Sequence, residues 1–283
     1  MSDIQYVAVI GAGTMGNGIA HVLGKYGLHV TLCDSDRGAL DRALATIENN
    51  LAREVAKAKL DQDGAHAARA RITPTVKLDD AAPADLVIEA IPENRTLKQE
   101  LFRRLDAMLQ PEALIASNTS SISITELAAA TSRPDRCLGL HFMNPVPIMR
   151  LVELIRGLAT SDLTAARAQQ LVHRIDKTPV EVRDFPGFVS NRVLMPMINE
   201  AIFCVLEGVG KPEAIDEIMK LGMAHPMGPL ALADFIGLDT CLNIMEVMHQ
   251  GLGDPKFRPC PLLRSMVAAG WLGRKSGRGF YSY

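Results

Sequence analysis

The sequence predicts an α/β protein in which a doubly wound parallel sheet is followed by a separate all-helical domain. Two observations support this fold class. Short, continuously apolar segments alternate with helical ones over the first two thirds of the chain, a pattern typical of parallel strands covered on both faces. Beyond the turn at Pro186 and Gly187, the remaining apolar segments have helical length and spacing. We therefore expect one domain at 1–186 and a second at 187–283.

In the first domain, strands are expected where short apolar segments end in a turn or a polar residue. A helix is expected over 19–25, and a longer one over 37–59, where apolar residues recur at spacings of three and four. The segments that connect the later strands are expected to be helical at least in part. The expected strands, in order, are 6–10, 29–33, 85–90, 113–117, 138–142 and 151–155.

The second domain is expected to consist of helices. The first, over 189–206, is long and apolar and is closed by Gly208. Pro212 opens the next helix, since proline is favoured in a first turn. Roughly 100 residues of helix form only a small core, so a second copy of the chain is expected to pack here in a homodimer. Further helices are expected over 229–236, 238–250 and 262–269.

The composition excludes several classes of function. The 283 residues carry a formal net charge of −2, whereas a general nucleic-acid binder is usually basic. The first apolar segment, 7–10, is far shorter than the ~20 residues of a membrane-spanning helix. The globular pattern begins almost at Met1, which leaves no room for a transit peptide. We therefore expect a cytoplasmic protein that binds neither nucleic acid nor membrane.

The five cysteines are widely spaced and include no C-x-x-C pair. This pattern is typical of a reduced intracellular protein and argues against both a disulfide framework and a cysteine-based zinc site. No metal is therefore expected.

The segment GAGTMG (11–16) matches the G-x-G-x-x-G pattern of dinucleotide-binding turns. An expected strand precedes it, an expected helix follows it, and Asp34 ends the next strand 18 residues after Gly16. This context predicts a Rossmann-type domain that binds a dinucleotide. A glycine turn without a ligand is the alternative.

Each residue of this motif has a physical role in nucleotide binding. Gly11 permits the tight turn, Gly13 lets the backbone approach the pyrophosphate, and Gly16 lets helix and strand pack closely. Thr14 and Met15 belong to the same motif and are expected to bind the cofactor, and N–H groups of the helix that follows meet the phosphate charge. Asp34 would accept hydrogen bonds from the adenosine ribose and repel a 2′-phosphate, which favours NAD over NADP, although the nearby Arg37 softens that preference.

A second set of polar residues follows the later strands. His141 ends the expected strand 138–142, and the carboxyl edge of a doubly wound sheet is where ligands bind. Glu153 lies inside the apolar strand 151–155, where a carboxylate is costly unless it is paired. His141 is its natural partner across neighbouring strands. The alternatives are a structural histidine and an edge-strand glutamate that faces water.

Six motifs, in order along the chain, now give a specific resemblance. The sequence resembles the short-chain L-3-hydroxyacyl-CoA dehydrogenase family, and within it most closely the bacterial 3-hydroxybutyryl-CoA dehydrogenases. The match covers nearly the whole chain. The motifs are GAGTMG (11–16), SNTSS (117–121), HFMNP (141–145), PGFV (186–189) with Asn191 and Arg192, HPMGP (225–229) and GRGFY (277–281).

The resemblance implies an NAD-dependent enzyme that interconverts (S)-3-hydroxyacyl-CoA and 3-ketoacyl-CoA. His141 is implied to be the catalytic base, with Glu153 orienting it. Ser120 and Asn191 are implied to hold the substrate oxygen and the reacting groups. The family also implies a homodimer formed mostly by the helical domain. Positions that line the nicotinamide and ribose end of the NAD site match Glu93, Lys98, Asn118 and Asn144.

The phosphates of a CoA substrate need cations. Lys57 and Lys59, at the end of the long expected helix, match a basic region of the family and are candidates for this role. A solvated helix face is an equally good interpretation of either one. The basic stretch 274–278 could approach a ligand or simply dock the terminus.

Two other functions remain open on the same scaffold. The β-hydroxyacid dehydrogenases also join a Rossmann domain to a helical one, but they use a helical lysine base, and the matching segment here, GFVSN (187–191), has no lysine. A structural protein that binds NAD without catalysis is the other alternative, because fold alone does not fix function. The complete set of Ser120, His141, Glu153 and Asn191 argues against it.

Overall fold

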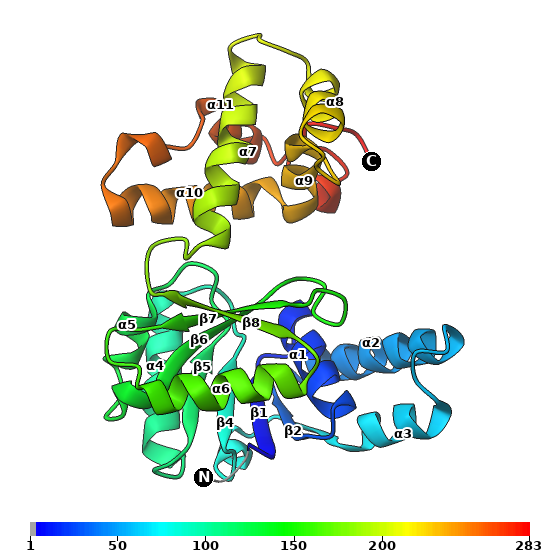
Figure 1. The fold of residues 1–283 in the computed structure, drawn as a ribbon, viewed down its shortest axis with the longest axis vertical. Coiled ribbons are helices and arrows are strands. Elements are labelled where there is room, and N and C mark those ends of the chain that lie inside the picture. Colours follow the sequence, from blue (N-terminus) through cyan, green and yellow to red (C-terminus); the bar gives the residue numbers. More distant parts are fainter. Residues whose placement is uncertain (1–3) are drawn as a thin grey trace. The chain divides into compact units, whose positions relative to one another are not determined.

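The computed structural model describes residues 4–283, which form two compact units (Figure 1). The first unit ends at Asp184, and the second runs from Phe185 to Tyr283. No helix within residues 4–283 combines the length and the apolar character that crossing a membrane requires.

The first unit is built on one eight-stranded sheet with the order β3-β2-β1-β4-β5-β6-β7-β8. The chain moves outward from β1 in both directions, so the order reverses at β1 as in a doubly wound sheet. The predicted fold class is confirmed. The strands are β1 (Tyr6–Ile10), β2 (His29–Cys33), β3 (Ile72–Thr75), β4 (Leu86–Glu89), β5 (Leu114–Ser117), β6 (Cys137–Phe142), β7 (Leu151–Arg156) and β8 (Thr178–Arg183).

Helices cover both faces of this sheet, and each face has its own apolar core. One core joins the strands to α1 (Thr14–Lys25), α2 (Arg37–Ala56), α3 (Gln62–Ala70) and α6 (Asp162–Arg174). The other joins the strands to α4 (Arg95–Met108) and α5 (Ile124–Ala128). Figure 1 shows α6 lying across one face of the sheet, while α2 and α3 extend beyond the sheet edge. The central strands are buried on both sides, which explains their continuously apolar sequences.

Strands β7 and β8 depart from the purely parallel sheet that the sequence predicts. Strand β7 pairs antiparallel with β6, and β8 runs parallel to β7. The connection from β6 to β7, residues 143–150, is too short for a parallel crossover, which needs about a dozen residues or more. The reversal places the start of β7 beside the end of β6.

Sequence patterns also missed two strands and misplaced helix ends, since α1 begins at Thr14 rather than at residue 19. Strand β3 contains Pro74 and lies at a sheet edge, where short and polar strands are tolerated. Strand β8 is the opposite edge and is largely exposed. Helix α2 ends at Ala56 rather than at residue 59, so Lys57 and Lys59 lie in the exposed turn before α3.

The second unit consists of helices around a separate apolar core, to which Met195, Met245, Met248 and Met266 contribute. Pro212 and Pro229 open α8 and α9 as the first helical residues, as expected. The α-helices are α7 (Ser190–Leu206), α8 (Pro212–Gly222), α9 (Pro229–Ile236), α10 (Leu238–Leu252) and α11 (Pro261–Ala268).

Candidate active site

The glycine-rich turn joins β1 to α1 at the point where the strand order reverses. Gly11 has a φ of +105°, and a Cβ there would lie 2.5 Å from the carbonyl oxygen of Ala90. A Cβ on Gly16 would lie 1.7 Å from the carbonyl oxygen of Gly11. Both glycines are therefore required by the fold of the turn itself.

Gly13 differs from its two neighbours in the motif. It is exposed, and a Cβ at this position would meet no protein atom within 4 Å. It is also the N-cap of α1, and no side chain caps this helix end. Since the protein leaves room for a side chain at Gly13, the absence of one suits a ligand that approaches the backbone and the helix N-terminus. The turn thus fits the pyrophosphate of a dinucleotide.

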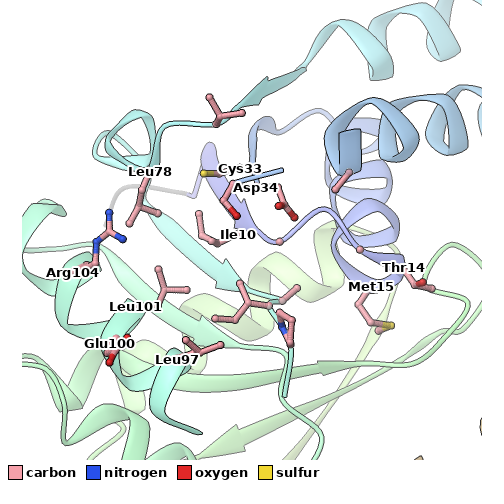
Figure 2. Close-up of a pocket in the computed structure, with 18 residues that line it drawn as sticks. Ile10, Thr14, Met15, Cys33, Asp34, Leu78, Leu97, Glu100, Leu101 and Arg104 are labelled. Atoms are coloured by element: carbon pink, nitrogen blue, oxygen red, sulfur yellow. The ribbon is translucent and has the colours of Figure 1, made fainter. Parts of the chain in front are cut away.

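A cavity of about 790 Å³ opens beside this turn (Figure 2). Asp34, at the end of β2, lines it, and its two carboxylate oxygens accept hydrogen bonds from Ala12 N at 2.7 Å and Asp36 N at 2.9 Å. Each oxygen can accept a further bond, so the carboxylate is fixed and still able to bind hydroxyls. The lining also includes the apolar side chains of Val76, Leu78, Leu97 and Leu101, together with Glu100 and Arg104. The cavity combines a hydroxyl acceptor with an apolar wall for a flat ring.

His141 and Glu153 face each other across β6 and β7. The two residues are register partners in the antiparallel pair, and His141 Nδ1 lies 2.8 Å from Glu153 Oε2 in a hydrogen bond. His141 is 9% exposed and Glu153 3%. The buried glutamate therefore has the partner that the sequence suggested. Such a pair can fix the orientation of the imidazole and stabilise its charged form.

The loop after β5 is held by Glu93. Glu93 Oε1 accepts hydrogen bonds from Thr119 Oγ1 at 2.5 Å, Ser121 Oγ at 2.8 Å and Ser120 N at 3.2 Å. Burial acts to raise the pKa of Glu93, but the charge of Lys98 and the hydroxyl hydrogen bonds outweigh it, and the pKa lies below its ordinary value. An ionised Glu93 thus fixes the backbone that carries Ser120.

Asn118 links this loop to the histidine strand. Its Oδ1 accepts a hydrogen bond from the backbone N–H of Phe142, the neighbour of His141, at 2.9 Å. Asn144 is exposed three residues after His141 and precedes a cis peptide bond to Pro145. Both asparagines therefore lie close to His141 in the chain or in space.

Lys98 is buried, whereas a lysine that binds a ligand at the surface would be exposed. It is 1% exposed, and its Nζ lies 2.6 Å from Glu89 Oε1, 3.3 Å from Glu93 Oε2 and 3.2 Å from the carbonyl oxygen of Ile91. Asn191 lies in the first turn of α7 in the second unit and is 7% exposed.

Comparison with known proteins places the chain in a family. The model described as "3-hydroxyacyl-CoA dehydrogenase, NAD binding domain" matches residues 6–185, and the model of the C-terminal domain matches residues 187–283. The chain belongs to the 3-hydroxyacyl-CoA dehydrogenase family. The predicted resemblance is confirmed, and as a family member the chain is an NAD-dependent dehydrogenase.

Individual members of the 3-hydroxyacyl-CoA dehydrogenase family match the chain along nearly its whole length. It is 59% identical over 281 residues to a probable 3-hydroxybutyryl-CoA dehydrogenase of Bacillus subtilis, covering 99% of this chain and 98% of that protein. It is 57% identical over 280 residues to a 3-hydroxybutyryl-CoA dehydrogenase of Bradyrhizobium diazoefficiens, covering 99% and 96%. The crystal structure of (S)-3-hydroxybutyryl-CoA dehydrogenase from Ralstonia eutropha has a TM-score of 0.96 at 52% identity, covering 99% of each chain.

Sequence reasoning missed two groups of residues around this site. The apolar wall of the cavity, with Leu78 and Leu101, carries no local signal because it is assembled from separate segments. Glu89 and Ser117 are fully buried polar residues at the ends of β4 and β5. Glu89 had a usable signal, since a carboxylate at the end of a buried apolar strand needs a partner, as Glu153 does.

Proposed function

We propose that the chain interconverts (S)-3-hydroxybutyryl-CoA, or a related (S)-3-hydroxyacyl-CoA, and the corresponding 3-ketoacyl-CoA with NAD(H). The observation that carries this proposal is the hydrogen bond between His141 and Glu153. It is supported by the names of relatives at 57–59% identity. The cavity beside the Gly13 turn, with Asp34 in its wall, supports NAD as the nucleotide.

His141 acts as general base and general acid in this proposal. Its Nδ1 is engaged by Glu153, so Nε2 is the nitrogen that removes the proton of the 3-hydroxyl and returns it in the reverse direction. Glu153 fixes the tautomer and stabilises the imidazolium. A bound NAD would supply the acceptor for the hydride of carbon 3, and NADH would supply the hydride in the reverse direction. Ser120 and Asn191 are proposed to donate hydrogen bonds to the substrate oxygen.

The remaining parts of the proposal concern ligand binding and assembly. Glu93, Asn118, Asn144 and Lys98 are proposed to form the nicotinamide end of the site. The exposed Lys57 and Lys59 are proposed to meet the CoA phosphates. The helical domain, 187–283, is proposed to contribute to the substrate cleft and to form a homodimer in the cytoplasm.

The experiment that tests the reaction is an absorbance assay of NADH oxidation with acetoacetyl-CoA. We expect turnover with acetoacetyl-CoA, much less with free acetoacetate, and a preference for NADH over NADPH. Activity on a free hydroxyacid with none on acetoacetyl-CoA would instead identify a β-hydroxyacid dehydrogenase. NADH binding without turnover of either substrate would contradict the proposed catalysis.

The cofactor turn is tested by Gly13→Ala. The methyl group meets no protein atom but would stand where the pyrophosphate approaches, so we expect the Kd of NADH to rise about ten-fold or more with an unchanged Tm. Gly222→Ala is the matched control, because a Cβ there also meets nothing within 4 Å. Equal NADH affinity in the two variants would show that Gly13 does not face the cofactor.

A further inference from the structure

Glu89 holds a completely buried carboxylate at the carboxyl end of β4. Its Oε1 accepts hydrogen bonds from Lys98 Nζ at 2.6 Å and from Ile91 N at 2.7 Å, and its Oε2 accepts one from Ser117 Oγ at 2.5 Å. The dehydration of a buried ion pair largely offsets the attraction of its charges, so the pair is expected to add little to stability. Its effect on the position of neighbouring groups is therefore the more informative property.

Both side-chain partners of Glu89, Lys98 and Ser117, are linked to Glu93 by polar contacts. Lys98 Nζ lies 3.3 Å from Glu93 Oε2. On the other side, Ser117 Oγ accepts a hydrogen bond from Thr119 N at 3.1 Å, and Thr119 Oγ1 donates to Glu93 Oε1 at 2.5 Å. The five residues close a ring of polar contacts that joins β4, α4 and the loop after β5.

This ring of Glu89, Lys98, Glu93, Thr119 and Ser117 connects residues next to the nucleotide cavity with the loop that carries Ser120. Glu89 is the register partner of Ile10, directly before the Gly11 turn. Ala90, Ile91 and Pro92, the residues that follow it, line the 790 Å³ cavity. On the other side of the ring, Glu93 accepts a hydrogen bond from the backbone N–H of Ser120.

We propose that Glu89 is a positioning residue that orients Lys98 and Ser117 and thereby fixes the 91–93 and 117–121 segments toward the cofactor and the substrate. The inference rests on the proposed function for its substrate end only. Glu89 is fully buried, does not line the cavity and acts through its two side-chain partners. A side chain that cannot accept both hydrogen bonds leaves the two segments free to shift, and catalysis is sensitive to displacements on the order of 1 Å.

Glu89→Gln is the direct test. Glutamine keeps the volume but removes the charge, and its NH2 group must face either Ser117, where the hydrogen bond to the hydroxyl reverses direction, or Lys98, where it is lost. We expect the Kd of NADH to rise and kcat to fall, each by about ten-fold. The Kd is measured by fluorescence titration, and both quantities are measured at a temperature well below the Tm. Glu112→Gln is the matched control, because Glu112 has a 79% exposed side chain paired with Arg136. A lower Tm with the NADH affinity and kcat of the control would mean a merely structural role and would overturn the proposal.

Ser117→Ala is the second variant. It keeps the ion pair of Glu89 and Lys98 and removes only the hydroxyl that donates to Glu89. We therefore expect the Kd of NADH to rise and kcat to fall, each by about three-fold. If Glu89→Gln does not fold, wild-type NADH affinity and kcat in Ser117→Ala overturn the proposal. The NADH titrations need no substrate. Inactivity of the wild type on acetoacetyl-CoA would therefore refute the proposed function, while the titrations would still decide the role of Glu89.

Discussion

Two buried histidines in the first unit each lie near a glutamate, but the two pairs are built differently. His141 Nδ1 and Glu153 Oε2 are 2.8 Å apart and share a hydrogen bond across β6 and β7. His21, on α1, is fully buried, and its Nε2 lies 3.4 Å from Glu54 Oε1. Within residues 4–283, neither ring nitrogen of His21 has a hydrogen-bond partner.

The difference lies in what each glutamate binds. Glu54 is engaged by the ammonium group of Lys25, whereas Glu153 is opposite His141 in the sheet register. Burial disfavours the charged imidazole of His21, and nearby Lys25 and Lys177 disfavour it further, so the pKa of His21 lies below its ordinary value although Glu54 acts to raise it. We therefore expect His141, which is hydrogen-bonded to a carboxylate, to exchange protons, and we expect His21, which is only near one, not to do so.

The largest expected effect is that of His141→Gln. Loss of the proposed general base should lower kcat for acetoacetyl-CoA about 10³-fold or more, while NADH affinity stays within a few-fold. His21→Gln is the matched control and should keep kcat within about two-fold, because no carboxylate is hydrogen-bonded to this histidine within residues 4–283. Steady-state kinetics and NADH titration measure both. Near-normal turnover in His141→Gln would remove His141 as the base.

Glu153→Gln should have the next largest effect. The amide keeps the shape but would lack the charge that is proposed to stabilise the imidazolium, so we expect kcat to fall about 10²-fold with the fold intact by circular dichroism. The same substitution in the other pair, Glu54→Gln, should leave kcat within about two-fold. If both variants lose activity equally, or neither does, the distinction between the two pairs has no catalytic meaning.

The comparison also shows where sequence reasoning works and where it stops. Strands β1 and β2 were predicted at their observed bounds, because buried parallel strands are continuously apolar and end in recognisable turns. Edge strands β3 and β8 were missed, because partial exposure lets Pro74 and polar residues interrupt the apolar pattern. The antiparallel direction of β7 depends on the length of a connection and not on the strand sequence.

The residues of the candidate site also divide into those that the sequence could predict and those that it could not. The opposition of His141 and Glu153 was predictable, since a glutamate in an apolar strand requires a partner and a histidine ends the neighbouring strand. The ring around Glu89 was not predictable, because Lys98 lies on a helix and Ser117 on another strand. Only the tertiary fold brings them together. The roles of all predicted site residues stay predictions, those of His141 and Glu153 included.

The smallest expected effect concerns stability and pH. Because the pKa of His21 is lower in the folded protein than the ~6.5 of an unfolded chain, the unfolded state binds more protons as the pH falls below that value, and stability is lost there. His21→Gln removes this cost, so its Tm should fall less than the wild-type Tm between about pH 7.5 and 5.5, by roughly 2–4 °C in a thermal scan. The exposed His66, changed to Gln, is the control and should follow the wild type. A wild-type slope in His21→Gln would show that the attraction of Glu54 already compensates for the burial of His21 and for the charges of Lys25 and Lys177, and the two histidines would then differ only in position.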